Sequence, residues 1–315
     1  MSSILAVDFG GTNIRVARFE NGQPPAQAQI KTPTIAEEGP EAVLQRLKAS
    51  IAQLLPPDKS NLRIGIGAPA PVDPYRGVVL SAPNLPGWTE IPLQQIVEDE
   101  FDARVFLGND ANLAALGEWK FGAGQGARNL VYLTISTGIG GGVIIDGRLL
   151  LGAHGLAAEL GHLMVDMHGP RCGCGQRGHI EAIAAGPAIA RRAIAALESG
   201  ASSSLTATYT ADGDLDAAKV GEAALAGDEL AVGIILDTGE ILGAHLANLA
   251  HTFNPDTFVL GGGVSQIGPL LLDSIEKSMH EHIMNPAYLD GLKISPAELG
   301  DDAGLVGALV LASQD

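Results

Sequence analysis

Residues 4–19 read Ile-Leu-Ala-Val-Asp-Phe-Gly-Gly-Thr-Asn-Ile-Arg-Val-Ala-Arg-Phe, two apolar runs joined by a glycine turn. Short apolar runs on both sides of paired glycines are typical of a β-hairpin. Gly10 and Gly11 let backbone amides approach an anion, Thr12 adds a hydroxyl, and Asp8 is placed to hold a Mg²⁺ ion. The alternative is an ordinary tight turn with a surface Asp8.

The same order of strand, glycine turn and strand recurs later in the chain. Residues 130–135 are predicted to form a strand. Residues 136–142 (Ser-Thr-Gly-Ile-Gly-Gly-Gly) are predicted to form a glycine loop, and residues 143–145 are predicted to form the paired strand. Residues 257–260 then form an apolar run that enters three glycines, 261–263. The recurrence predicts two similar α/β halves around one phosphate-bearing ligand, and two unrelated hairpins are the alternative. The G-x-G-x-x-G spacing of a Rossmann fingerprint fails at residues 261–263, and no Walker A sequence occurs in the chain.

Length and composition favour a protein that binds a small molecule. The chain has 315 residues, 46% of them hydrophobic, and a net charge of -17, enough for two cores. The acidic balance and the scattered Lys and Arg argue against nucleic acid or an anionic membrane as a partner. No secretory signal or run of membrane-spanning length is visible, and the two cysteines lie one residue apart. We therefore expect a cytoplasmic protein.

Periodicity and breakers predict further elements. Helices are expected at 40–55, 111–119, 187–197, 215–226, 231–253 and 304–311, strands at 62–66 and 103–107, irregular chain at 81–88, and a loop at 199–214. The last helix is expected to pack back on the N-terminal half.

Two polar side chains stand where ligands are commonly bound. Asp110 follows a predicted strand and begins a predicted helix, the position at which open α/β sheets place ligands. A carboxylate there can accept the proton of an attacking hydroxyl in phosphoryl transfer, although Asp110 as a simple helix N-cap is the alternative. Asn84 lies in the Pro- and Gly-rich segment 81–88 and is either a turn former or a hydrogen-bonding ligand group.

Residues 159–181 concentrate imidazoles, carboxylates and both cysteines. Four of these side chains have the type and number of a closed tetrahedral zinc site: His162, Cys172, Cys174 and His179. Glu159 and Glu181 are not among these four ligands and are available for another role. The spacing of Glu159 and His162 places both side chains on one face of a helical turn, so one ring nitrogen could bind zinc while the other meets a substrate hydroxyl. The alternative for His179 is a non-ligand, with His168 or water in its place.

Five segments, in this order, resemble the motifs of the ROK family of bacterial sugar kinases and sugar-responsive repressors. They are Asp-Phe-Gly-Gly-Thr-Asn at 8–13, Gly-Asn-Asp-Ala-Asn at 108–112, the glycine loop at 136–142, Glu-Leu-Gly-His at 159–162 and Leu-Gly-Gly-Gly-Val at 260–264. The resemblance implies the actin-like ATPase (ribonuclease H-like) fold, with two α/β domains flanking a cleft. We expect a small domain at 1–118, completed by the helix at 303–315, and a large zinc-containing domain at 119–302.

The resemblance also implies residue roles. Asp110 would be the catalytic base for the primary hydroxyl of a sugar. The other residues implied to contact the sugar are Asn84, Asn109, Glu159, His162 and Glu181. Asp8 would organise Mg²⁺. The residues implied to surround ATP are Asp8, Gly10, Gly11, Thr12, Asn13, Thr137, Gly138, Gly140, Gly261, Gly262 and Gly263.

The implied zinc site departs from the family pattern. The family binds zinc through one His and three Cys, and His179 stands here where the third Cys is usual. Two His and two Cys still form a sound zinc site, with one negative charge fewer. The zinc would be structural, because the base is expected at Asp110.

The implied activity is ATP-dependent phosphorylation of the 6-hydroxyl of a hexose. The close Cys-Gly-Cys-Gly spacing resembles the family's glucose-phosphorylating members, which favours D-glucose, with mannose, fructose or an N-acetylhexosamine as alternatives. Polyphosphate is an alternative donor. A repressor is disfavoured because the first strand begins near Ile4 and the charge is negative, and a sugar-binding protein without catalysis is a third possibility. The resemblance further implies a homodimer or homotetramer, and domain closure on sugar binding.

Overall fold

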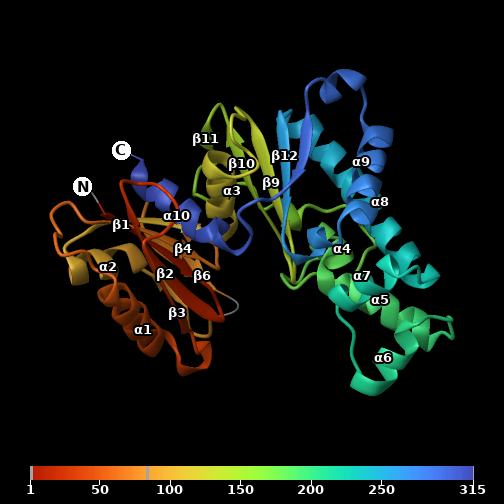
Figure 1. The fold of residues 1–315 in the computed structure, drawn as a ribbon, viewed down its shortest axis with the longest axis horizontal. Coiled ribbons are helices and arrows are strands. Elements are labelled where there is room, and N and C mark those ends of the chain that lie inside the picture. The colour runs from red at the N-terminus through yellow and green to blue at the C-terminus, as the bar shows by residue number, and fades with distance from the viewer. Residues whose placement is uncertain (1–2, 83–84, 315) are drawn as a thin grey trace. The chain divides into compact units, whose positions relative to one another are not determined.

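The computed structural model describes residues 3–82 and 85–314. Its strands are β1 (Ser3–Phe9), β2 (Asn13–Glu20), β3 (Ala28–Pro33), β4 (Arg63–Ala68), β5 (Val72–Asp73), β6 (Val78–Ser81), β7 (Thr89–Ile91), β8 (Arg104–Asn109), β9 (Leu130–Ile135), β10 (Ile139–Ile145), β11 (Arg148–Leu149), β12 (Thr257–Gly261) and β13 (Lys293–Pro296) (Figure 1). Its α-helices are α1 (Pro40–Gln53), α2 (Leu93–Phe101), α3 (Asp110–Phe121), α4 (Ile180–Ala184), α5 (Gly186–Glu198), α6 (Leu205–Asp212), α7 (Ala217–Leu225), α8 (Glu229–Phe253), α9 (Pro269–His282) and α10 (Ala303–Ser313).

The chain forms two compact units. The first comprises Met1–Gly126, Gly142–Ala158 and Glu298–Asp315, and the second comprises Ala127–Gly141 and Glu159–Ala297. The domain division expected after residue 118 and again after residue 302 stays a prediction.

The two large sheets have the same strand plan. One runs β3-β2-β1-β4-β8 and the other β11-β10-β9-β12-β13. In the first, β1 pairs antiparallel with β2 and parallel with β4, which pairs parallel with β8. In the second, β9 pairs parallel with β12, and β12 with β13. The shared plan confirms the prediction of two similar α/β halves and argues against two unrelated hairpins. A small third sheet has the order β5-β6-β7.

The helix that carries Asp110 is fixed by the C-terminal helix α10. This helix is buried along nearly its whole length and packs against α3, β1 and β4 (Figure 1). A Cβ atom added at Gly307 would lie 1.7 Å from the carbonyl oxygen of Leu113, so α3 and α10 touch backbone to backbone. Such a close approach is available only to glycine. The expected return of the last helix to the N-terminal half is confirmed.

Most expected elements lie within a few residues of their predicted bounds, but two expectations are wrong. Residues 199–214 are not all loop, since α6 spans Leu205–Asp212. Leu205 is 3% exposed and its amide donates to the Ser203 hydroxyl at 3.0 Å, so one apolar anchor and one local hydrogen bond fix the start of α6 where no periodicity was visible.

Residues 139–142 are also not loop, because they belong to strand β10. The glycines there are required by packing rather than by a turn. A Cβ atom at Gly141 would lie 2.7 Å from the Leu160 side chain, and one at Gly142 would lie 2.5 Å from the Ala115 side chain. Helices α2 and α9 and strands β3 and β13 were not predicted.

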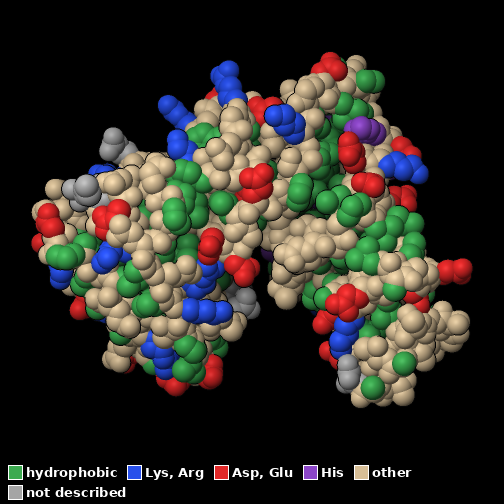
Figure 2. Space-filling view, in the orientation of Figure 1, with side chains coloured by type: hydrophobic (Ala, Val, Ile, Leu, Met, Phe, Trp, Pro, Cys, Tyr) green, Lys and Arg blue, Asp and Glu red, His purple; other side chains and the backbone are tan. Residues whose placement is uncertain are grey.

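Helix α8 is long and apolar enough to span a membrane by length and composition alone. It packs along α9 and α7, and 56% of its most apolar window is buried within the protein, as expected for a core helix (Figure 1). The face in Figure 2 shows acidic side chains interspersed with basic ones, without a continuous basic stripe.

Candidate active site

Asp110 lies at the junction of β8 and α3, as the sequence predicted. The N-cap of α3 is Asn109, whose Oδ1 accepts hydrogen bonds from the amides of Ala111 (3.0 Å) and Asn112 (3.3 Å). The interpretation of Asp110 as the N-cap is therefore wrong. Asp110 is the first helical residue, and its Oδ1 accepts from the Ala111 amide at 2.8 Å. The positive end of the helix dipole favours a charged carboxylate there, which is the form that a base requires.

The Asn109 side chain makes more hydrogen bonds than the sequence suggested. Besides capping α3, it donates through Nδ2 to the Ala70 carbonyl at 3.3 Å. Its predicted sugar contact stays a prediction.

Asp8 ends strand β1 beside a turn that the rest of the first unit holds in place. The Gly10 amide donates to the Asn13 carbonyl at 2.8 Å, and the Thr34 hydroxyl donates to the Gly10 carbonyl at 2.7 Å. Thr12 at the tip is exposed. The predicted hairpin is confirmed, and its tip offers a hydroxyl to a ligand.

The carboxylate of Asp8 faces the guanidinium of Arg15 at 3.7 Å. Burial raises the pKa of Asp8, and Arg15 opposes this shift while Asp301 and Asp302 add to it. Asp8 is thus a partly buried carboxylate with a fixed cationic neighbour, rather than an ordinary surface residue. Arg15 also binds the Asp302 carboxylate. No local sequence pattern identified Arg15, because its partners Asp301 and Asp302 come from the far end of the chain.

In the second unit, Glu181 joins two of the predicted motifs. It lies in the first turn of α4. Its Oε2 accepts from the Ile139 amide at 3.1 Å, and its Oε1 lies 3.2 Å from the Cys172 sulfur. A Cβ atom at Gly138 would lie 2.6 Å from Oε2, so the glycine admits the carboxylate. Thr137 beside it is exposed.

The structure brings the four predicted metal ligands together. One donor atom from each of His162, Cys172, Cys174 and His179 lies within 4.8 Å of the others. The Cys172 sulfur is 3.7 Å from His162 Nδ1, and the Cys174 sulfur is 3.3 Å from His179 Nδ1. Sulfur and nitrogen ligands of one tetrahedral zinc ion lie about 3.5 Å apart, given metal distances of about 2.3 and 2.0 Å. The donor set therefore fits Zn²⁺.

The protonation of Cys172 bears on this fit. Burial raises the pKa of its thiol to about 11, with the Cys174 backbone amide lowering it and Glu181 raising it again. Zinc binds thiolate, so metal uptake there would release a proton and weaken as the pH falls.

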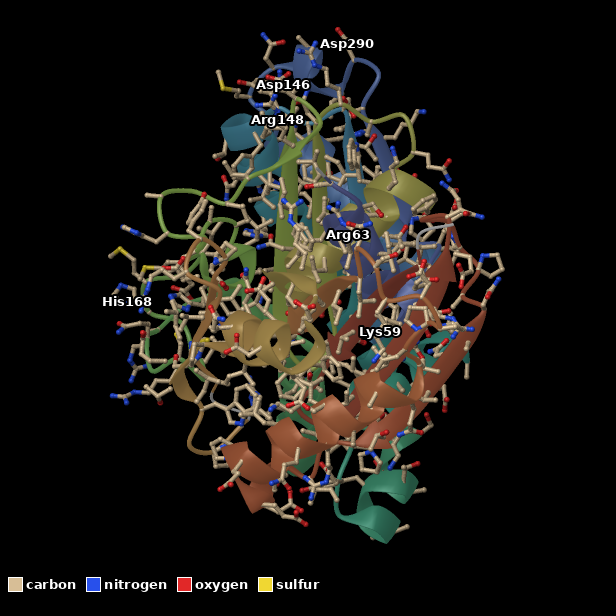
Figure 3. The ribbon with its side chains drawn as sticks, turned by 90° about the vertical axis from the view of Figure 1, so that its left-hand side faces the viewer. Lys59, Arg63, Asp146, Arg148, His168 and Asp290 are labelled. Carbon is tan, nitrogen blue, oxygen red and sulfur yellow. The ribbon has the colours of Figure 1, made fainter. Side chains whose placement is uncertain are left out.

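His168, the alternative ligand, is exposed, lies at the margin of the molecule in Figure 3, and does not belong to the cluster. His162 and Glu159 belong to one short 3-10 turn, in which Glu159 is the N-cap of Leu160–His162. The expected placement of the Glu159 and His162 side chains on one face stays a prediction. Both cluster histidines face sulfur through Nδ1, which leaves Nε2 of His162 on the opposite edge of the ring.

Glycines 261–263 continue β12 into the short 3-10 helix Gly263–Ile267. Gly262 has a φ of 85°, and a Cβ atom there would lie 2.3 Å from the Ile135 carbonyl oxygen. Only glycine fits this position. Gly263 has nothing within 4 Å of its added Cβ, so this turn presents open backbone. Asn84, the remaining predicted contact, lies outside the described residues.

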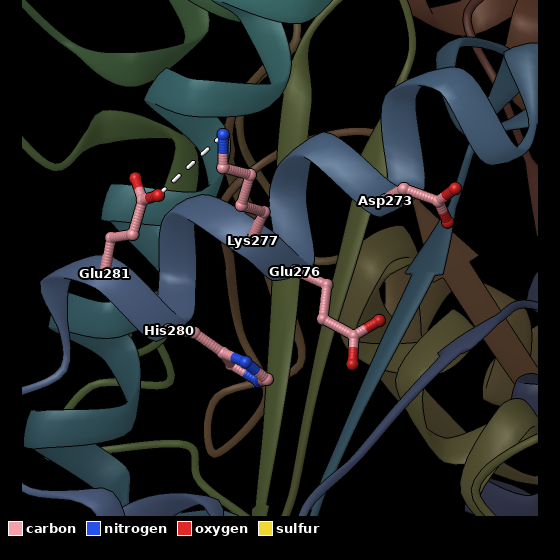
Figure 4. A pocket seen from close by; sticks show the side chains of 5 residues that line it. All are labelled: Asp273, Glu276, Lys277, His280 and Glu281. Carbon is pink, nitrogen blue, oxygen red and sulfur yellow. Dashed lines mark ion pairs between the residues drawn. The ribbon is translucent and has the colours of Figure 1, made fainter.

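A separate shallow hollow of about 520 Å³ lies over α9 (Figure 4). Its lining side chains are Asp273, Glu276, Lys277, His280 and Glu281. Lys277 and Glu281 form an exposed ion pair of 3.9 Å, a geometry that contributes little in water. None of the residues predicted from the sequence lines this hollow.

Comparison with known proteins places these observations in a family. The model of the ROK family matches residues 4–315. The chain belongs to the ROK family. It is 35% identical over 306 residues to a glucokinase of Thermotoga maritima, covering 97% of this chain and 95% of that protein. It is 37% identical over 319 residues to a glucokinase of Streptomyces coelicolor, covering 100% and 98% of the two chains.

A solved structure of another ROK protein shows that the similarity extends to the three-dimensional fold. The structure of a ROK family glucokinase from Streptomyces griseus, in complex with glucose and AMPPNP, has a TM-score of 0.81 and 36% identity, with 100% of both chains covered. The expected membership in the ROK family, with its actin-like ATPase fold, is thereby confirmed.

Proposed function

We propose that this ROK protein is an ATP-dependent hexose kinase that phosphorylates the 6-hydroxyl of D-glucose. The observation that carries the proposal is the near-full-length similarity to glucokinases, one of them solved with glucose and an ATP analogue. The placement of Asp110 at the carboxyl end of a parallel strand and the start of a helix supports it chemically.

Asp110 is assigned as the general base. Phosphoryl transfer needs positioning, charge neutralisation and removal of one hydroxyl proton. The Asp110 carboxylate would accept the proton of the 6-hydroxyl as the new P–O bond forms. The capping bonds of Asn109 hold the first turn of α3 and with it the direction of Asp110.

The remaining hexose contacts are assigned to Asn84, Asn109, Glu159, His162 and Glu181. The bond from the Ile139 amide to Glu181 and the packing of the turn at 159–162 against β10 support these roles, because a substrate contact needs side chains whose position is already fixed.

The glycine turns are assigned to the nucleotide. The turn at 10–13, the three residues Thr137, Gly138 and Gly140, and the glycines at 261–263 would surround ATP with backbone amides and the Thr12 and Thr137 hydroxyls. Asp8 would hold Mg²⁺, which when bound neutralises phosphate charge. Arg15 keeps the Asp8 carboxylate oriented.

Zinc is assigned a structural role at His162, Cys172, Cys174 and His179. The distances between these donors support it. We further propose a cytoplasmic enzyme that acts as a homodimer or homotetramer, and that has no nucleic acid or membrane partner.

A panel of sugars and donors tests the assignment. Purified protein is assayed with glucose, mannose, fructose and N-acetylhexosamines, against ATP and polyphosphate, with zinc quantified on the same sample. We expect the highest kcat/KM for glucose with ATP. Failure to phosphorylate any hexose would refute the enzyme assignment.

The base is tested by Asp110→Asn. This variant keeps the size of the side chain but cannot accept the proton, so kcat should fall by about 10²- to 10⁴-fold. Glucose binding measured by calorimetry should persist. If Asp110→Asn keeps its turnover, another group is the base.

A further inference from the structure

His245 is an unusual residue for its surroundings. It lies in the middle of α8 among buried apolar residues and is 1% exposed. Burial lowers the pKa of its imidazole to about 4, so the ring is neutral at physiological pH. Within the described part of the chain its Nε2 has no hydrogen-bond partner. A buried polar ring in an apolar helix costs stability unless a bond elsewhere requires it.

The other side of the ring makes such a bond. His245 hydrogen bonds to the backbone carbonyl of Leu160, and because Nε2 is unpartnered the bond belongs to Nδ1. Leu160 is the first helical residue of the 3-10 turn that carries Glu159 on one side and His162 on the other. The imidazole therefore contacts the turn between its two functional side chains.

Within the turn, the His162 amide donates to the Glu159 carbonyl at 3.1 Å and the Leu163 amide donates to the Leu160 carbonyl at 3.5 Å, and packing holds the turn against the sheet. A Cβ atom at Gly161 would lie 1.8 Å from the Ile139 carbonyl oxygen, so the turn lies flat against β10. The Leu160 side chain packs on Gly141 of the same strand. Packing against a strand fixes the distance of the turn from the sheet, whereas a directional bond to the Leu160 carbonyl fixes its rotation.

We propose that His245 is a positioning residue for hexose binding, which holds the turn at residues 159–162 through the Leu160 carbonyl. It touches neither substrate nor metal in this role. The proposal rests on the proposed function, because it assumes that Glu159 and His162 contact a hexose.

The test compares three variants. His245→Leu fills the site without a donor, and His245→Asn retains a donor near the position of Nδ1. Thr238→Val is the matched control, since Thr238 is 0% exposed in the same helix and its hydroxyl bonds to the Ile234 carbonyl within the helix and to Arg192.

We expect His245→Leu to raise the KM for glucose about tenfold, with the KM for ATP within twofold of the wild type. The melting temperature should change little, because removing the unpartnered Nε2 offsets the lost bond. His245→Asn should restore most of the glucose affinity, and Thr238→Val should leave it unchanged. An unchanged KM for glucose in His245→Leu, or equal losses in the Leu and Asn variants, would overturn the proposal.

A readout without activity separates this proposal from the proposed function. Hydrogen exchange followed by mass spectrometry on the peptide covering 159–163 should be faster in His245→Leu than in Thr238→Val. If the wild type phosphorylates no hexose but this difference is present, the enzyme assignment fails and the anchoring of the turn stands. If the wild type is active and exchange is equal in both variants, the anchoring fails alone.

Discussion

The substitution Gly138→Ala tests the role of Glu181, because it adds a single methyl group beside the Glu181 carboxylate. The added Cβ atom of Gly138→Ala would lie 2.6 Å from Glu181 Oε2, whereas carbon and oxygen normally approach to about 3.3 Å. The backbone of Gly138 is not in the left-handed region, so alanine is compatible with it. The flexible carboxylate must therefore withdraw by roughly 0.7 Å, the difference between these two distances.

This withdrawal breaks a specific bond. Oε2 lies 3.1 Å from the Ile139 amide, and a further displacement of that size takes the pair beyond hydrogen-bonding distance. A bond to a charged acceptor contributes about 1.5–3 kcal/mol, and we take the lower end because Glu181 is only partly buried. If Glu181 binds the hexose, the KM for glucose should rise about tenfold.

The assay is steady-state kinetics with glucose varied at saturating ATP, in four proteins: wild type, Gly138→Ala, Glu181→Ala and the double variant. Because the methyl group is expected to act through Glu181, it should add little in the Glu181→Ala background. Gly233→Ala is the control, since nothing lies within 4 Å of its added Cβ and the residue lies outside the proposed sites. The reasoning is refuted if a folded Gly138→Ala protein keeps its KM for glucose, or if the loss is as large without the Glu181 side chain.

Three further outcomes are expected. Cys174→Ser should lower the zinc content below one ion per chain by atomic absorption and lower the melting temperature, and a wild type that contains no zinc contradicts this. Asp228→Asn should destabilise the protein at pH 7 but progressively less as the pH falls from about 5 to 2, because hydrogen bonds hold the folded pKa of Asp228 at about 2, below its unfolded value. Urea unfolding at each pH measures this, and a constant difference counts against it. Gly307→Ala should cost about 3 kcal/mol through its clash with the Leu113 carbonyl, whereas Gly233→Ala, with open space around it, should not.

The features that the sequence predicted are those that depend on residues close to one another in the chain. The glycine turns repeat a pattern, the strand before Asp110 is local, and the four candidate zinc ligands all lie between residues 162 and 179. The sequence could not predict the contacts that support the site, because these contacts join segments that are far apart in the chain. His245 is a buried polar residue among apolar neighbours of α8, and nothing around it in the sequence indicated that Leu160 is its partner. The glycines at 141 and 142 suggested a loop, because sequence does not distinguish a glycine needed for a turn from one needed for a close neighbour.

The proposed zinc site would show why a metal without a catalytic role is useful in this protein. His162 ends the short turn that Glu159 begins, and His179 is the N-cap of α4, whose second residue is Glu181. One ion bound to both histidines would fix the two segments that carry both carboxylates. Each segment is short, five residues in the case of α4, and a helix of that length has little stability of its own. Replacing the third cysteine of the family by His179 keeps this connection, because it depends on where the ligand lies in the chain rather than on whether sulfur or nitrogen binds the metal.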